Sequence, residues 1–369
     1  MIFSKISNYY ISRRNAAIEQ SRHGRIAYID LIKGILILTV IYYHTSQNPL
    51  ISGRFADMLE ARIPAFMCIS FLFFKEYSGF ADFATRKFCK LIIPFTTIGV
   101  VNCLLTQHSI SLTFDSGISA LRGIMSTPLW FLYTLFMCHI EYYIFNSITC
   151  RLSFLWRLII ATMVSLVVCH GLFFDRWVFA LSHIYVNFNI SHHPLLLQLY
   201  SPIRILPVLV IMKQLRTTSF FQKRFSFKTL FILLFFSMTI WALFSDPHYD
   251  SRSLQYGKSP VLYQLEILSL ISTLYCVGNI VYWFPVVSYV GRYSIIVLMV
   301  HSILFKVLPR YSYSSVILFS LHLGICLLAI PIFLKYLPYL CAQKDLFTYN
   351  AKLRKIQFNN PFSKESKQP

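Results

Sequence analysis

Charged residues are scarce in this chain, and acidic residues are the scarcest of them. Only 13% of the 369 residues are charged, and Asp and Glu together number 14. A soluble globular protein has about 25% charged residues. Hydrophobic residues make up 56% of the chain, and the mean hydropathy is +0.58. The composition therefore excludes an ordinary soluble enzyme and indicates a polytopic membrane protein.

Paired cysteines and the familiar motifs of soluble enzymes are also missing. The nine cysteines are scattered, mostly inside apolar runs, and no CxxC pair occurs. This pattern favours small packing residues in helices, so we expect no disulfide framework and no metal site. The sequence has no GxSxG elbow, HExxH pair, P-loop or dinucleotide fingerprint. Any chemistry therefore has to use histidines and intramembrane charges.

Basic residues outnumber acidic ones by 20. They cluster in short segments between hydrophobic runs, which is the orientation signal of a membrane protein and does not indicate nucleic-acid binding. We predict an all-α, polytopic integral membrane protein with about ten transmembrane helices in one bundle. The spans lie near 28–46, 61–78, 90–106, 128–148, 155–174, 194–212, 227–245, 262–283, 286–308 and 315–339.

The distribution of Lys and Arg predicts the orientation. If both termini are cytoplasmic, the inner segments hold 25 of the 34 Lys and Arg residues and the outer segments hold eight. We therefore predict a multi-pass protein of the cytoplasmic (inner) membrane. It would have a cytoplasmic segment 1–26, a transmembrane domain 27–340 and a basic cytoplasmic tail 341–369.

The first predicted span keeps ionisable groups inside an apolar helix. Asp30 and Lys33 lie near its start, and His44 lies near its end. Such groups bear a desolvation cost, so a functional role is the default interpretation. Eleven residues make about three helical turns, which puts Lys33 and His44 on one face about 16 Å apart along the axis. Lys33 would be nearer the cytoplasm, and His44 nearer the outer face.

Each of these residues also has a purely structural explanation. His44 could be a general base toward an outer hydroxyl, or an interface histidine bonded to a backbone carbonyl. Lys33 could bind an anionic donor, pair with Asp30, or reach the headgroups. Arg86, Lys87 and Lys90 could form a phosphate site, or could simply belong to the positive-inside bias.

The outer half of the predicted bundle contains further candidates. Trp130 could be an interface aromatic residue or a stacking platform for a sugar ring. Glu266 is a carboxylate within a span and needs a partner, for which Arg204 is one option. His301 is predicted at a membrane depth similar to that of His44. The two could share one site, or their similar depth could be a coincidence.

Several segments, in order, resemble acyltransferase family 3, the membrane O-acyltransferases of surface polysaccharides. The resemblance covers about residues 25–340. It rests on Asp30, Lys33-Gly34 and His44; Ile63-Pro64-Ala65-Phe66 with Ser70; Lys90-Leu91-Ile92-Ile93-Pro94-Phe95; Leu129-Trp130-Phe131-Leu132; and Gly291-Arg292-Tyr293-Ser294 with His301. Four positions depart from the family's usual residues. Phe71 stands where the family usually has glycine, Lys33 where it often has arginine, and Lys87 and Lys90 where it often has two arginines three residues apart.

The resemblance implies the transfer of an acyl group, most often acetyl, from cytoplasmic acyl-CoA to a hydroxyl of an extracytoplasmic glycan or lipid-linked sugar. Acyl-CoA would be a co-substrate, with no permanently bound cofactor. The implied residues are His44, as base or transient acyl carrier, with Asp30 and Lys33 in the catalytic group; Lys33, Arg86, Lys87 and Lys90 for the donor; and Trp130, His301 and Glu266 on the acceptor side.

Other functions stay open on the sequence. A transporter or flippase of a sugar-linked lipid would use intramembrane charges equally well, and a structural subunit is a weaker option. The acceptor could be lipopolysaccharide, capsule, peptidoglycan, a free sugar or a small metabolite, and the acyl group could be acetyl or succinyl. We expect any soluble partner protein to be a separate chain.

Overall fold

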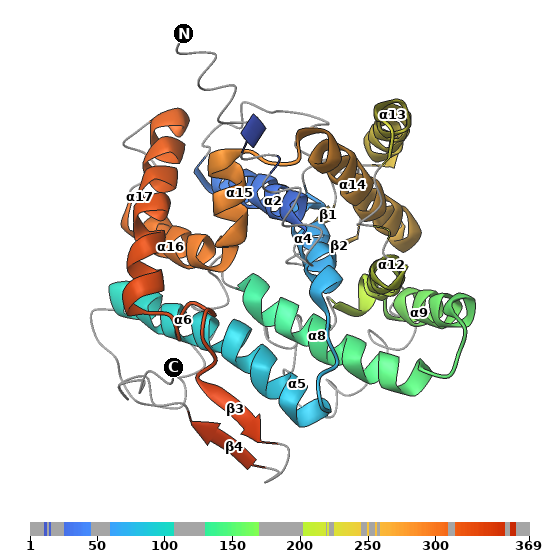
Figure 1. Cartoon of the computed structure of the whole chain (residues 1–369), viewed down its shortest axis with the longest axis horizontal. Helices are drawn as coiled ribbons and strands as arrows, with labels where there is room; N and C mark the ends of the chain where they lie inside the picture. Colours follow the sequence, from blue (N-terminus) through green and yellow to red (C-terminus); the bar gives the residue numbers. More distant parts are fainter. Residues whose placement is uncertain are drawn as a thin grey trace, which may run out of the picture.

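The computed structural model of the protein describes residues 11–12, 15, 26–45, 60–106, 130–169, 202–218, 220, 225–244, 249–250, 255–256, 259–308, 314–350 and 355–358. Helices dominate the described residues (Figure 1). They are α2 (Ala27–Thr45), α4 (Arg62–Ser70), α5 (Phe80–Lys87), α6 (Ile93–Thr106), α8 (Trp130–Thr149), α9 (Phe154–Cys169), α12 (Leu206–Thr217), α13 (Phe227–Phe244), α14 (Pro260–Val281), α15 (Pro285–Arg292), α16 (Ser294–Val307) and α17 (Ser315–Tyr336).

Helices occupy part of every predicted span, which confirms the mostly helical fold. Four of them, α2, α13, α14 and α17, are long and apolar enough to cross a membrane. The pair α15 and α16, bent by 88°, would be a fifth if it forms one span. The remaining predicted spans contain shorter or more polar helices, such as the 12-residue α12. The count of ten spans and the cytoplasmic termini therefore stay predictions.

Helix α2 lies in the middle of the bundle (Figure 1), where it contacts α4, α14, α15, α16 and α17. Its apolar residues are spread around the whole circumference, and the buried ones include Ile29, Leu36 and Ile41. A helix that is apolar on every side is one that other helices surround. The neighbours of α2 therefore fix the positions of the residues at its two ends.

Two glycines allow α2 and α15 to approach each other closely. A Cβ atom on Gly291 would lie 1.8 Å from the carbonyl oxygen of Asp30, and one on Gly34 would lie 1.9 Å from that of Val287. A Cβ atom at such distances would overlap the carbonyl oxygen, so only glycine fits. Small residues of this kind allow two helix backbones to come into contact. Glycine at these positions therefore brings the Gly291-Arg292-Tyr293-Ser294 segment onto the helix that carries Lys33 and His44.

A continuous helical run leads from α5 through η2 (Phe88–Ile92) into α6, and η2 is a single π-helical turn. Such turns are rare and are frequently found at functional sites. The short 3₁₀ turn η1 (Phe71–Phe73) ends α4 and faces α12. Turn η1 follows α4, and turn η2 joins α5 to α6. Basic side chains lie at both turns: Lys90 belongs to η2, and Lys33 lies over the ring of Phe73 in η1.

Two small antiparallel hairpins were not expected in an all-α chain. Strands β1 (Tyr249–Asp250) and β2 (Gln255–Tyr256) form one, and β3 (Phe347–Asn350) and β4 (Lys355–Phe358) form the other. The second lies within the predicted tail 341–369, and β3 packs against α5 (Figure 1). Part of that tail is therefore folded against the bundle.

Candidate active site

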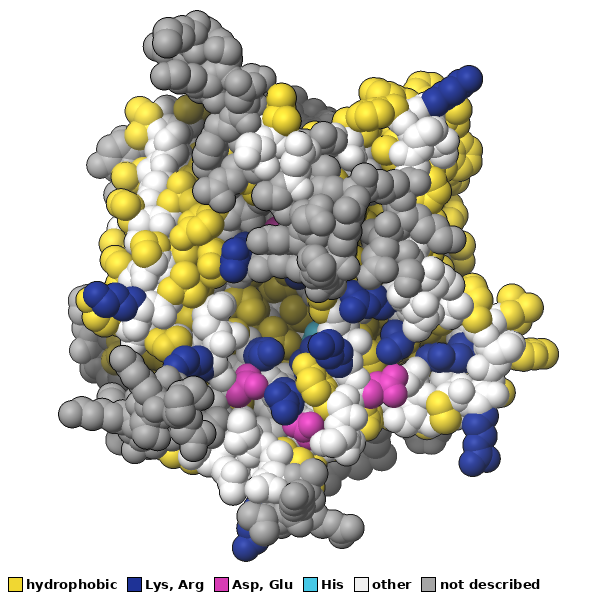
Figure 2. Space-filling model, viewed as in Figure 1, with side chains coloured by type: hydrophobic (Ala, Val, Ile, Leu, Met, Phe, Trp, Pro, Cys, Tyr) yellow, Lys and Arg dark blue, Asp and Glu magenta, His cyan; other side chains and the backbone are white. Residues whose placement is uncertain are grey.

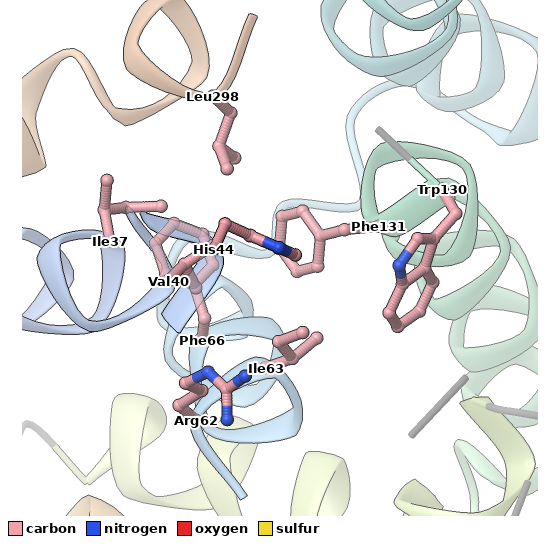
Figure 3. A pocket seen from close by; sticks show the side chains of 9 residues that line it. All are labelled: Ile37, Val40, His44, Arg62, Ile63, Phe66, Trp130, Phe131 and Leu298. Carbon is pink, nitrogen blue, oxygen red and sulfur yellow. The ribbon is translucent and has the colours of Figure 1, made fainter. Parts of the chain in front are cut away.

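His44 lies in the last turn of α2 and lines a pocket between α2, α4, α8 and α16. Figure 3 shows its imidazole reaching into the middle, with Leu298 above and Arg62 below. The empty space within the pocket, including the part open to its surroundings, is about 360 Å³. Apolar residues form most of the wall, and the polar groups are His44, Arg62 and the indole of Trp130. Apolar walls with a few polar groups are typical of small-molecule sites.

Arg62 brings a buried positive charge to this pocket. Its side chain is only 4% exposed, and its guanidinium lies 4.2 Å from the centre of the Tyr43 ring. It also forms an ion pair with Glu60 at 3.4 Å. Arg62 was not among the candidate residues that the sequence singled out. Its position at the edge of an apolar run was the one available sign of a functional role.

Three histidines follow one another near the C-terminal end of α2. The ring centres of His44 and His301 are 5.4 Å apart, and those of His301 and His322 are also 5.4 Å apart. His301 on α16 and His322 on α17 are both buried. His322 donates its Nδ1 hydrogen to the carbonyl of Leu318 at 2.9 Å, which fixes its tautomer. The structure thus places His301 beside His44 and adds His322, which the sequence did not single out.

A separate group of lysines lies around the opposite end of α2. The ammonium of Lys33 is 4.5 Å from the centre of the Phe73 ring, and that of Lys87 is 3.3 Å from Nε2 of His139. Burial, followed by the neighbouring charges of Lys90 and Lys33, lowers the pKa of Lys87 to about 7. The three ammonium groups therefore repel one another, and a bound anion would stabilise them.

Figure 2 shows one face of the molecule, on which basic side chains are concentrated. Lys and Arg side chains gather around a central hollow whose floor is hydrophobic. We call the group formed by Lys33, Lys87 and Lys90 the basic mouth. The basic mouth and the His44 pocket lie at the two ends of α2, since Lys33 and His44 are both on that helix.

A scan against protein families matches residues 26–338 to an acyltransferase domain, that of acyltransferase family 3. The chain belongs to this family. The match runs from the start of α2 to just beyond α17, so it includes both the His44 pocket and the basic mouth. The protein is thus a membrane acyltransferase. Searches of curated proteins and of solved structures found no match.

The predicted acceptor-side residues of this acyltransferase do not all lie together. Trp130, at the start of α8, lines the His44 pocket, and His301 touches the His44 ring. Glu266 is buried on α14 and does not line the pocket. Asp30 lies in the first turn of α2, at the opposite end from His44. A direct contact of either carboxylate with a substrate in the pocket therefore has no support in this geometry.

Arg86 differs from the three lysines of the acyltransferase's basic mouth. It donates to Asp82 at 2.7 Å and forms an ion pair with Asp345 at 3.6 Å. Burial alone would raise the pKa of the Asp82 carboxyl, but hydrogen bonds from Ser78 and Arg86 outweigh it and lower that pKa. Two carboxylates thus hold Arg86, which ties the segment before β3 to α5.

His139 and Phe71 explain one departure from the family's usual residues. His139 is buried, and its ring stacks on that of Phe71 at a centre-to-centre distance of 4.5 Å. Phe71 also stacks on Phe74 at 5.7 Å and is fully buried. Where the family usually has glycine, this acyltransferase therefore has a buried aromatic ring that packs against His139, the residue whose Nε2 contacts Lys87.

Proposed function

We propose that this acyltransferase moves an acetyl group from cytoplasmic acetyl-CoA to a hydroxyl of an extracytoplasmic glycan or lipid-linked sugar, as a multi-pass protein of the cytoplasmic membrane. The main observation in support is that one central helix has a basic site at one end and a pocket histidine at the other. The two ends are about 16 Å apart along the helix axis. Supplying isolated membranes with acetyl-labelled CoA and measuring label on glycan tests the proposal.

The basic mouth suits the phosphates of the donor. Lys33, Lys87 and Lys90 gather positive charge at one place, and lysine binds phosphate as a point charge. The uncharged pantetheine arm is flexible, and in this proposal it extends along α2 from the basic mouth towards His44. The thioester would then meet the acceptor at the pocket, while the charged end of CoA stays on the cytoplasmic side.

The His44 pocket suits the acceptor. Trp130 offers an aromatic face for a sugar ring, and His44 takes the proton from the attacking hydroxyl. The hydroxyl oxygen forms the new C–O bond at the thioester carbonyl, the C–S bond breaks, and the thiolate leaves with the proton that His44 returns. Arg62 stabilises the negative oxygen that develops on the carbonyl. His301 holds the His44 ring in position through their contact.

Replacing Arg62 with glutamine is expected to lower kcat about 100-fold, the loss seen when one oxyanion-stabilising donor is removed. The KM for acetyl-CoA should change little, because the phosphates bind at the other end of α2. Steady-state kinetics on purified protein checks both values, and Arg62→Lys, which keeps the charge, should retain more activity. A kcat for Arg62→Gln equal to that of the intact protein would rule out this role.

Donor binding is expected to weaken as the pH rises from 6 to 8. Lys87 has a pKa of about 7, so it is charged below that pH and neutral above it. Losing one charge next to a phosphate should raise the Kd for CoA about tenfold. In Lys87→Arg the charge persists at every pH in this range. Titration calorimetry on both proteins isolates Lys87, since ionisation of CoA itself affects them equally; identical pH profiles would contradict the assignment.

A further inference from the structure

Phe73 is an exposed aromatic ring at the edge of the basic mouth. It ends η1, and 37% of its side chain is exposed, whereas the preceding Leu72 and the following Phe74 are buried. Two cations from different helices approach this one ring. The ammonium of Lys33 lies 4.5 Å from its centre, and the guanidinium carbon of Arg216 lies 5.9 Å from it.

The two basic residues of α12 near this ring differ in their surroundings. Lys213 forms an ion pair with Glu76 at 3.4 Å and lies 5.0 Å from the centre of the Phe74 ring. Arg216, one turn further along, forms no ion pair with any carboxylate in the described part of the chain. A carboxylate thus already compensates Lys213, while the charge of Arg216 is available to an anion.

We propose that Phe73 and Arg216 bind the nucleotide end of the acyl-CoA donor, Phe73 by stacking on the adenine and Arg216 by binding a phosphate of the adenosine part, which 4′-phosphopantetheine lacks. This assignment rests on the proposed function, in which acyl-CoA is the donor. An exposed aromatic ring flanked by cations is the combination that binds a nucleotide, because the base stacks and the phosphates are neutralised. A bare phosphate site would need the cations but not the exposed ring.

The position of Lys33 connects this subsite to the reaction. Lys33 and Arg216 both lie over the Phe73 ring. Lys33 is also on α2, the helix that carries His44. A donor whose adenine rests on Phe73 therefore has its phosphates between Arg216 and the lysines of the basic mouth. Its arm then starts at the cytoplasmic end of α2, on the way to the pocket.

Equilibrium binding of two probes to the purified full-length protein tests the subsite without depending on turnover. CoA has the arm and the nucleotide, and 4′-phosphopantetheine has the arm and one phosphate but no adenosine. Arg216→Gln is expected to weaken CoA binding about tenfold. Phe73→Leu is expected to weaken it about fivefold or more, the range for loss of one base stack. Neither variant should change binding of 4′-phosphopantetheine. Arg151→Gln, an exposed arginine between α8 and α9, is the matched control.

Two results would overturn the subsite. One is CoA affinity that neither variant changes, as expected if Arg216 only binds lipid headgroups. The other is an equal loss for both probes, which indicates a general structural role. Phe73→Tyr, which keeps the ring, should restore CoA affinity if Phe73→Leu loses it. If the intact protein binds CoA with this pattern but transfers no acetyl group, the proposed function fails and the subsite stands. No CoA binding by the intact protein would contradict both.

Discussion

Replacing His44 with alanine is expected to abolish acetyl transfer, with kcat at least 1,000-fold lower. General acid–base catalysis by a positioned side chain accounts for about 10²–10⁴-fold of a rate. Among the described residues around the pocket, none is placed to substitute for the base, because the Arg62 guanidinium has no acceptor atom and His301 is fully buried behind His44. Release of free CoA, followed with a thiol reagent in the presence of acceptor, gives the rate directly.

The variant has to remain folded for this result to count. His44 is only partly buried and lies near the end of α2, so its truncation should leave the bundle intact. The unfolding temperature and the amount of protein in the membrane, each compared with the intact protein, provide the control. Full activity in a folded His44→Ala protein would remove His44 from the catalytic step.

Gly291→Ala is expected to lower both stability and activity strongly. The added Cβ would lie 1.8 Å from the carbonyl oxygen of Asp30 and 2.5 Å from the amide nitrogen of Gly34. Backbone atoms cannot rotate away as a side chain can, so α15 and α2 must separate. Overpacking in a core costs about 1–3 kcal/mol and occasionally more, and we expect about 3 kcal/mol here. Thermal unfolding in detergent measures the loss.

Gly324 on α17 provides the matched control for this prediction. A Cβ at Gly324 would have nothing within 4 Å, so Gly324→Ala should be neutral or slightly stabilising, as alanine usually is in a helix. Activity of Gly291→Ala should fall together with stability, because α2 carries both Lys33 and His44. Equal unfolding temperatures for Gly291→Ala and Gly324→Ala would show that the two helices are not in close contact.

The sequence was most informative where one helix determines the geometry. The spacing of Lys33 and His44 follows from the helical repeat, and the structure keeps both on α2. The apolar runs located the helices, since burial in lipid or in a bundle requires such runs. The resemblance to the family added the link between this helix and the Gly291-Arg292-Tyr293-Ser294 segment.

Features that depend on packing between distant segments could not be predicted. Arg62, His322 and Arg216 matter because α4, α17 and α12 meet other elements, and no local pattern encodes those contacts. The bend of 88° within the predicted span 286–308 is hidden, because the apolar run continues through it. The sequence did not predict that α2 and α15 come into close contact at Gly34 and Gly291, although both glycines lie within the family motifs.

The hairpin of β3 and β4 illustrates a different kind of omission. Its two strands have only four residues each, too few for a clear strand pattern, and the sequence therefore predicted only a basic tail for this segment. The amide of Phe347 donates to the sulfur of Cys89 at 3.2 Å, and Asp345 pairs with Arg86. Contacts with a helix more than 250 residues away thus hold this segment, which explains why Arg86 is engaged while its neighbours Lys87 and Lys90 form the basic mouth.

Transfer across a sealed vesicle tests the central claim most directly. Inside-out vesicles expose the cytoplasmic face, so acetyl-labelled CoA added outside reaches only the basic mouth, and the acceptor is enclosed in the lumen. We predict label on the enclosed acceptor with the intact protein and none with His44→Ala. Label found only on acceptor supplied on the same side as the donor would contradict transfer across the membrane. Movement of the acceptor across the membrane without any label would instead support the flippase hypothesis.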